Sequence, residues 1–166
     1  MASVTFKGTP VAITGDLPAV GSAVPAFTAV GGDLSEISPA DFAGKQLILN
    51  IFPSIDTGVC ATSVRSFNEQ AGGKDGVVVL CLSMDLPFAM TRFCGAEGIE
   101  GVQVGSLFRD QGFAASYGAV MTEGPLKGLT ARAVLVVGAD GVIKHVELVP
   151  EIAQEPDYAA ALAALG

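Results

Sequence analysis

The part of the sequence best suited to chemistry is a cysteine that follows an apolar run, a proline and a threonine. Residues 46–60 read QLILNIFPSIDTGVC, and the apolar run LILNIF is typical of a buried strand. Pro53 ends that strand without needing a ladder hydrogen bond, and its ring can shield a nearby sulfur from water. Cys60, seven residues later, is therefore a candidate nucleophile.

A helix is predicted directly after this turn, and it would favour the thiolate form of Cys60. The segment VCATSVRSFNEQAGG carries apolar residues at helical spacing and closes on two glycines, which predicts a helix over residues 58–71. Cys60 would lie in its first turn, where unpaired backbone N–H groups and the helix dipole favour an anion. Thr57 can place its hydroxyl beside the sulfur and orient an incoming oxygen.

The cation that such a thiolate needs is predicted to be Arg132. It interrupts LTARAVLVV, a run that otherwise reads as core, and a buried guanidinium requires an anionic partner. Deprotonated Cys60 is the most economical partner. An alternative is an ion pair of Arg132 with Glu123 or Asp110 at the surface.

Each of these residues also has a plainer interpretation. Pro53 could serve only as a strand terminator, and Thr57 only as the N-cap of the helix. Cys81, inside the apolar run VVVLCLS, is typical of a small buried hydrophobe. Asp56 would oppose a thiolate if it pointed inward, so we expect it to face solvent or to cap the turn.

The number of cysteines and histidines limits the other thiol chemistries. Three cysteines are too few, and odd in number, for a disulfide framework, so they are structural, metal-bound or reactive. His145 is the only histidine, and no CxxC or HxxxH spacing is present to build a tetrahedral metal site. A Cys–His hydrolase is disfavoured too, because it needs a histidine base within reach of its thiol.

Composition and charge exclude several classes of partner. The net charge of -8 and the scattered basic residues argue against nucleic acid, whose phosphates require clustered Lys and Arg. No apolar run approaches the roughly 20 residues that cross a bilayer, and MASVTFKG does not resemble a secretion signal, so we expect a cytoplasmic protein without membrane contact. No GxGxxG follows a strand, so no flavin or nicotinamide cofactor is expected.

The order of predicted elements indicates one α/β domain over residues 1–166. It describes a central mixed β-sheet flanked by helices on both sides, which resembles the thioredoxin-like fold with an N-terminal β-hairpin extension. In chain order we predict a hairpin over 4–13, a helical turn over 38–44, strands over 47–52, 76–83 and 102–108, helices over 58–71, 85–95 and 110–118, a hairpin over 128–149 turning at Asp140–Gly141, and a helix over 156–165.

The segment around Cys60 carries a family resemblance. PSIDTGVC matches the PxxxTxxC signature of the peroxiredoxins. Together with SFNEQA, FCGAEG and GPLKGLTARAV, the chain resembles the bacterial thiol peroxidases, the atypical two-cysteine branch of that family, over essentially its whole length. The resemblance implies that Cys60 is the peroxidatic cysteine, Thr57 and Pro53 are its signature partners, Arg132 is the active-site arginine and Cys94 is the resolving cysteine.

The resemblance also implies an activity. A thiol-specific peroxidase of this kind reduces hydrogen peroxide and alkyl hydroperoxides through a sulfenic acid on Cys60 and an intramolecular Cys60–Cys94 disulfide. Thioredoxin would be the reductant, no cofactor is needed, and a homodimer is expected. A rival hypothesis is a redox-sensing thiol–disulfide interaction domain without efficient turnover. A dithiol oxidoreductase is weakened by the missing CxxC.

Two structural expectations follow from this chemistry. Disulfide geometry requires α-carbons within about 7 Å, so the first helical turn at Cys60 and the last turn at Cys94 are expected to unravel locally on oxidation. The negative dipole end of the second helix would keep Cys94 protonated until then. Alkyl substrates would suit an apolar mouth, whose candidate residues, otherwise plain core, are Phe52, Phe88, Phe93 and Met121.

Overall fold

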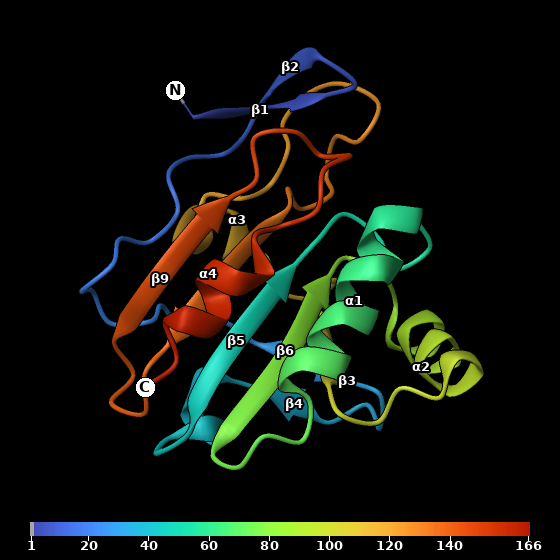
Figure 1. The fold of residues 1–166 in the computed structure, drawn as a ribbon. Coiled ribbons are helices and arrows are strands. Elements are labelled where there is room, and N and C mark those ends of the chain that lie inside the picture. Colours follow the sequence, from blue (N-terminus) through green and yellow to red (C-terminus); the bar gives the residue numbers. More distant parts are fainter. Residues whose placement is uncertain (1) are drawn as a thin grey trace.

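A seven-stranded mixed sheet forms the centre of the molecule in the computed structural model, which describes residues 2–166 (Figure 1). The strand order is β4-β3-β7-β6-β5-β8-β9, and β5, β6 and β7 run parallel in its middle. The strands are β3 (Ala29–Gly31), β4 (Glu36–Ile37), β5 (Gln46–Ile51), β6 (Val77–Ser83), β7 (Gln103–Ser106), β8 (Ala133–Val137) and β9 (Ile143–Leu148).

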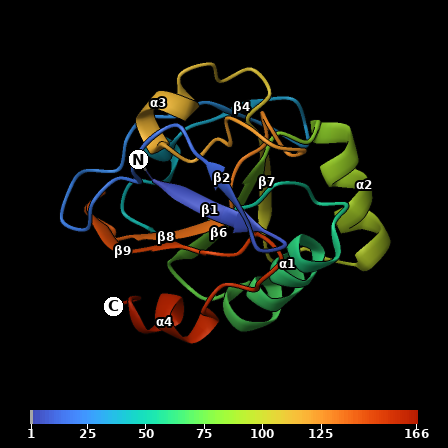
Figure 2. The same cartoon turned by 90° about the horizontal axis from the view of Figure 1, so that it is seen from above.

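Helices cover both faces of this sheet (Figure 2). On one face, α1 (Gly58–Ala71) and α4 (Tyr158–Ala163) pack over the strands, with α2 (Pro87–Glu97) beside them near β7. The other face is covered by α3 (Phe113–Tyr117) and the 3-10 turn η1 (Pro39–Phe42). The predicted α/β, thioredoxin-like architecture is confirmed.

The two central strands show why the site forms where it does. Along β5, Leu47, Leu49 and Ile51 face the α3 side, while Ile48 faces α1, so the strand is buried on both sides as expected for a parallel core strand. Since β5 and β6 are parallel, the chain leaves both at the same edge of the sheet. The loop before α1 and the loop before α2 therefore emerge side by side.

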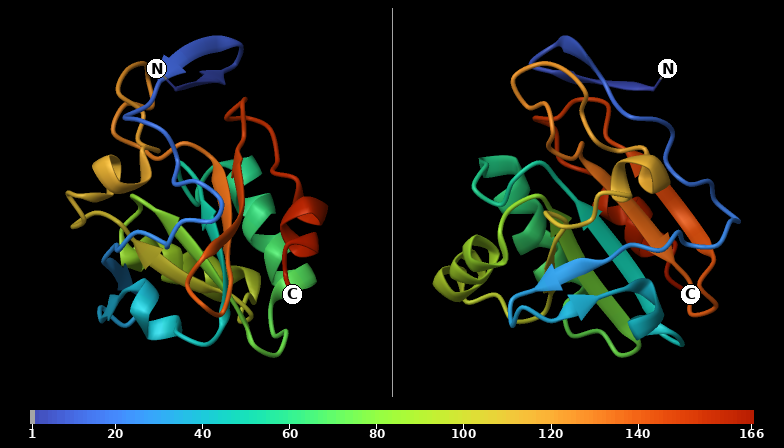
Figure 3. Two further views of the ribbon diagram at one scale, coloured as in Figure 1. Left: turned by 90° about the vertical axis from the view of Figure 1, so that its left-hand side faces the viewer. Right: turned by 180° about the vertical axis from the view of Figure 1, so that it is seen from behind.

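The predicted amino-terminal hairpin is present as a separate two-stranded sheet. Strands β1 (Ser3–Phe6) and β2 (Thr9–Ala12) pair around Lys7 and Gly8, whose φ angles of 52° and 81° suit a two-residue hairpin turn. The hairpin does not extend the central sheet but lies beyond the edge at which β5 ends (Figure 3). Its buried residues Val4 and Val11 pack with Met121 and Ile152 in a small hydrophobic cluster that is separate from the clusters on the two faces of the central sheet.

Several element boundaries differ from the sequence prediction. Helix α2 continues past Gly95 to Glu97, and Gly98, with a φ of 67°, forms its left-handed C-cap. It begins at Pro87, two residues after the predicted start at Asp85, and its N-cap is Leu86. Helix α4 begins two residues after the predicted start at Pro156, and its N-cap is Asp157. The short strands β3 and β4 were not predicted, because two or three residues carry no periodicity.

No helix in residues 2–166 is both long and apolar enough to span a bilayer.

Candidate active site

Cys60 is the third residue of α1, and its side chain is fully buried. The Arg132 guanidinium, at 1% exposure, lies against it, with Nη2 at 3.3 Å from Sγ. The predicted contact between the two residues is therefore present. A guanidinium and a helix amino terminus converge on one sulfur, and both stabilise negative charge there.

The backbone fixes the direction of the guanidinium. Nε and Nη2 of Arg132 donate to the carbonyl oxygen of Ile152 at 3.0 and 2.9 Å. Nη1 is buried and has no protein acceptor among the described residues, so it is left to meet an added acceptor. The surface alternatives are wrong, because Glu123 accepts from the amide of Ala12 and Asp110 from that of Thr28.

A cavity of about 250 Å³ opens beside this pair, and its wall is mostly apolar. Its lining residues are Phe6, Pro53, Thr57, Gly58, Val59, Leu126, Leu129, Arg132, Ile152 and Ala153. Pro53 and Thr57 thus join Arg132 in one wall, as their sequence positions suggested.

The cavity has an apolar wall, but the four residues predicted for it are wrong. Phe52 and Met121 are buried in the core, Phe88 is 67% exposed on α2, and Phe93 lies near Arg65 of α1. None of the four lines the cavity beside Arg132. Phe6, Leu126 and Leu129 supply the apolar surface in their place, from segments that no local pattern connects to Cys60.

Thr57 occupies the N-cap position of α1, but its side chain caps no helical amide. Its hydroxyl donates to the carbonyl oxygen of Ser54 at 3.1 Å. Since the proton is committed to that carbonyl, the Thr57 oxygen faces other groups as an acceptor.

Asp85 organises the loop that carries Thr57, a role the sequence reasoning missed. Its carboxylate accepts from the hydroxyl of Ser54 at 2.8 Å, the amide of Ile55 at 2.7 Å and the hydroxyl of Ser83 at 2.6 Å. This ties the loop after β5 to the loop after β6. The adjacent Asp56 faces solvent, as expected.

The other two cysteines are thiols in different surroundings. Cys94 lies near the end of α2 and is partly exposed, and burial raises the pKa of its thiol. Cys81 is fully buried in β6, where burial raises the pKa of its thiol to about 12. Both effects keep these sulfurs protonated at neutral pH. The structure attributes this to desolvation of Cys94, whereas the sequence argument relied on the helix dipole.

No metal centre is evident in residues 2–166, where no group of three or more histidine, cysteine or acidic side chains comes together. His145 lies on β9 and is not part of the cavity wall.

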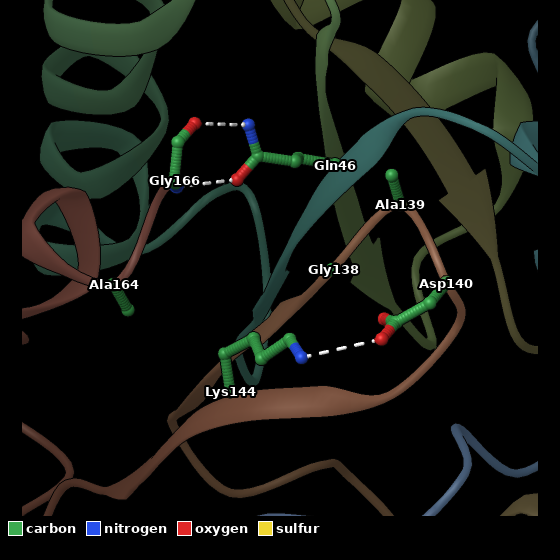
Figure 4. A pocket seen from close by; sticks show the side chains of 7 residues that line it. All are labelled: Gln46, Gly138, Ala139, Asp140, Lys144, Ala164 and Gly166. Carbon is green, nitrogen blue, oxygen red and sulfur yellow. Dashed lines mark hydrogen bonds and ion pairs between the residues drawn. The ribbon is translucent and has the colours of Figure 1, made fainter.

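A larger hollow of about 540 Å³ lies at the other end of β5 (Figure 4). There the side chain of Gln46 pairs with the backbone of Gly166, and Lys144 contacts Asp140 at 3.3 Å. Its wall contains no thiol, hydroxyl or imidazole side chain. Size alone does not mark the reactive site, because the smaller cavity is the one lined by Arg132, which contacts the Cys60 sulfur.

Comparison with known proteins agrees with this geometry. The Redoxin family model matches residues 19–162. The chain belongs to the Redoxin family. Within it, the chain is similar to the thiol peroxidases of Mycobacterium tuberculosis and Mycobacterium bovis, each 59% identical over 166 residues, which is 100% of this chain and 99% of each relative.

Two solved structures have a closely similar fold. A peroxiredoxin-like protein from Aquifex aeolicus superposes with a TM-score of 0.92 at 39% identity, covering 98% of this chain and 95% of the other. A thiol peroxidase from Chromobacterium violaceum gives a TM-score of 0.90 at 20% identity with the same coverage, which supports the fold. The resemblance inferred from PSIDTGVC is confirmed at the level of the family.

Proposed function

We propose that the protein is a thiol peroxidase that reduces hydroperoxides at Cys60. The observation that carries this proposal is the Arg132 guanidinium, which holds Nη2 at 3.3 Å from the buried sulfur and whose Nη1 has no acceptor within residues 2–166. Nη2 of the guanidinium stabilises the Cys60 sulfur as a nucleophile, and Nη1 is available to donate to a peroxide oxygen.

In the first step the Cys60 thiolate attacks one oxygen of the O–O bond. An S–O bond forms, the O–O bond breaks and the other oxygen leaves as an alkoxide or hydroxide that takes up a proton, so the sulfur is oxidised by two electrons to a sulfenic acid. Arg132 stabilises the charge on the oxygens as the bond stretches, which lowers the barrier only if it binds that state more tightly than the substrate. Thr57 accepts a hydrogen bond from the hydroperoxide proton.

In the second step Cys94 attacks the sulfenic sulfur, water leaves, and the two cysteines form a disulfide. The elevated pKa of Cys94 keeps it from competing for peroxide. Cys60 is fully buried in α1 whereas Cys94 is partly exposed on α2, so we expect the start of α1 and the end of α2 to unravel before the two sulfurs meet. An external dithiol, thioredoxin, then returns both cysteines to thiols by disulfide exchange.

The apolar wall formed by Phe6, Leu126 and Leu129 suits organic hydroperoxides in addition to hydrogen peroxide. The protein works as a homodimer, which the exposed apolar side chains of Leu86, Phe88 and Phe108 support.

We also propose a cytoplasmic location, because recycling of the disulfide by an external dithiol requires a reducing compartment.

The test is peptide mass spectrometry after one equivalent of peroxide. We expect a Cys60–Cys94 disulfide in the parent protein and a sulfenic acid on Cys60 in Cys94→Ser, which completes one turnover but is not recycled by thioredoxin. A disulfide that includes Cys81 would contradict the assignment. One stoichiometric oxidation of the parent without catalytic peroxide consumption would indicate a redox sensor instead.

A further inference from the structure

The amino-terminal hairpin is anchored to the segment that orients Arg132. The amide of Thr5 donates to the carbonyl of Pro150 at 2.7 Å, and the amide of Ile152 donates to the carbonyl of Thr5 at 2.8 Å. These bonds make a parallel bridge between Thr5 and Glu151. The hairpin is thus fastened by its first strand to three consecutive residues near the end of the chain.

The Glu151 carboxylate adds a second fastening. Its Oε1 accepts from the amide of Gly8 at 2.8 Å and from the hydroxyl of Thr5 at 3.2 Å, and its Oε2 accepts from the amide of Ala153 at 2.8 Å. These backbone donors lower the pKa of Glu151, so the side chain is ionised at neutral pH and both oxygens act as acceptors. One side chain therefore joins the turn of the hairpin to the 150–153 segment.

The hairpin and the 150–153 segment each contribute a residue to the wall of the 250 Å³ cavity beside Arg132. Phe6 lies between Thr5 and Gly8 in the hairpin, and its ring lines the cavity. Ile152 lies between Glu151 and Ala153, lines the same cavity, and offers the carbonyl that accepts from Arg132.

We propose that Glu151 is a positioning residue that seats the hairpin on the 150–153 segment and so sets the preference of the site for organic hydroperoxides over hydrogen peroxide. The inference rests on the proposed function of Cys60. Hydrogen peroxide needs only the sulfur and the polar groups around it. An organic hydroperoxide also needs the apolar wall, and the Phe6 part of that wall is in place only while the hairpin is seated.

The decisive variant is Glu151→Gln. Each carboxylate oxygen faces a backbone N–H that can only donate, so a carboxamide must turn its NH₂ group toward either Gly8 or Ala153. Glu147→Gln is the matched control. Both oxygens of Glu147 face the single amide of Asp157, at 2.9 and 3.3 Å, so the carboxamide oxygen preserves that bond while the same charge is lost.

For Glu151→Gln we expect kcat/KM for cumene hydroperoxide to fall about tenfold, in keeping with the loss of part of an apolar subsite. The value for hydrogen peroxide falls less, so the ratio of the two drops about threefold or more. Amide exchange across residues 3–12 becomes faster, while Glu147→Gln matches the parent in all three measurements. An unchanged ratio in Glu151→Gln would overturn the proposal.

Two further variants keep the outcome interpretable. If Glu151→Gln does not fold, Thr5→Val removes only the hydroxyl that contacts Glu151 and Pro150, and a smaller fall in the same ratio is expected. Equal kcat/KM losses for both peroxides in Thr5→Val would count against the proposal.

The Cys60→Ser variant distinguishes failure of the peroxidase assignment from failure of the role of Glu151. Retained turnover in Cys60→Ser would contradict the peroxidase assignment. Abolished turnover in Cys60→Ser together with an unchanged peroxide ratio in Glu151→Gln would contradict only the role of Glu151.

Discussion

Cys60 and Cys81 are both fully buried and belong to the same hydrophobic cluster, yet the polar groups around them differ. Cys60 lies in the first turn of a helix with a guanidinium at 3.3 Å, beside a cavity. Cys81 lies within β6, and its only polar contact in the described residues is the amide nitrogen of Asn50 at 3.8 Å. Burial does not decide whether a thiol is reactive; a nearby cation and a path for the substrate do.

The consequence of burial without a cation is visible at Cys81. Desolvation disfavours its thiolate and raises its pKa to about 12, although the hydrogen bond from Asn50 acts in the opposite direction. Such a sulfur stays protonated and acts as a packing group. Cys94 is intermediate, since its thiol is protonated but its position near the end of α2 lets it become accessible when that turn opens.

The largest expected effect tests this contrast directly. Serine at Cys60 removes the nucleophile, so Cys60→Ser should abolish peroxide consumption. Serine at Cys81 should leave it within about twofold of the parent, because no step uses that sulfur. The measurement is steady-state peroxide reduction with thioredoxin as the electron donor, and circular dichroism reports whether each variant is folded. Loss of turnover in a folded Cys81→Ser protein would contradict the assignment of Cys60 as the reactive thiol and Cys81 as a packing group.

A smaller loss of rate is expected when the Arg132 guanidinium is replaced by another cation. Arg132→Lys retains the charge but loses the planar fork that contacts Cys60 and Ile152 together and keeps a donor for the substrate. Removal of a preorganised donor of this kind costs about 10²- to 10³-fold in rate, and the retained charge should limit the loss to about 10- to 100-fold. Single-turnover oxidation of Cys60 measures it. The rate of Cys60 alkylation by iodoacetamide at neutral pH should fall in parallel, and a parent-like rate would contradict a role for the guanidinium.

The smallest effect concerns stability at alkaline pH. The pKa of Cys81 is raised from 9.0 to about 12 on folding, so its contribution to the free energy of unfolding is complete below about pH 9. Between these values the unfolded state loses its proton first, and stability declines by at most about 1.4 kcal/mol per pH unit from this group.

Cys81→Ala is the comparison that isolates this contribution. Deletion of the buried sulfur should lower the free energy of unfolding by about 1 kcal/mol at pH 7. The variant should then decline less steeply than the parent between pH 9 and 12. Tyr158, whose pKa burial raises to about 12, contributes equally to both proteins and cancels in the difference. Parallel curves from urea titrations would contradict the assignment.

The extent to which the sequence predicted the fold varies between elements. Helix α1 was predicted with its observed bounds of 58 and 71, because its apolar stripe and its glycine stop are local signals. Helix α2 was predicted with its observed length of 11 residues but two residues too early in the chain, because Gly95 is not its end and only Gly98 takes up the left-handed conformation that caps it. Asp85 was predicted as the first residue of this helix, but it lies before the helix and binds Ser54 and Ile55, which come from another loop.

The sequence by itself determined that Cys60 would begin a helix after a buried strand, and that Arg132 in an apolar run would need an anion. Both follow from rules that act locally or on any buried charge. Tertiary structure alone decided the direction of the guanidinium, set by the Ile152 carbonyl, and the wall that faces it, built from Phe6 and Leu126. The physical reason is that a contact between separate segments, 20 residues apart for Arg132 and Ile152 and more than a hundred apart for Phe6 and Leu126, leaves no periodic pattern in either segment. Such contacts exist only once the sheet has brought the segments together.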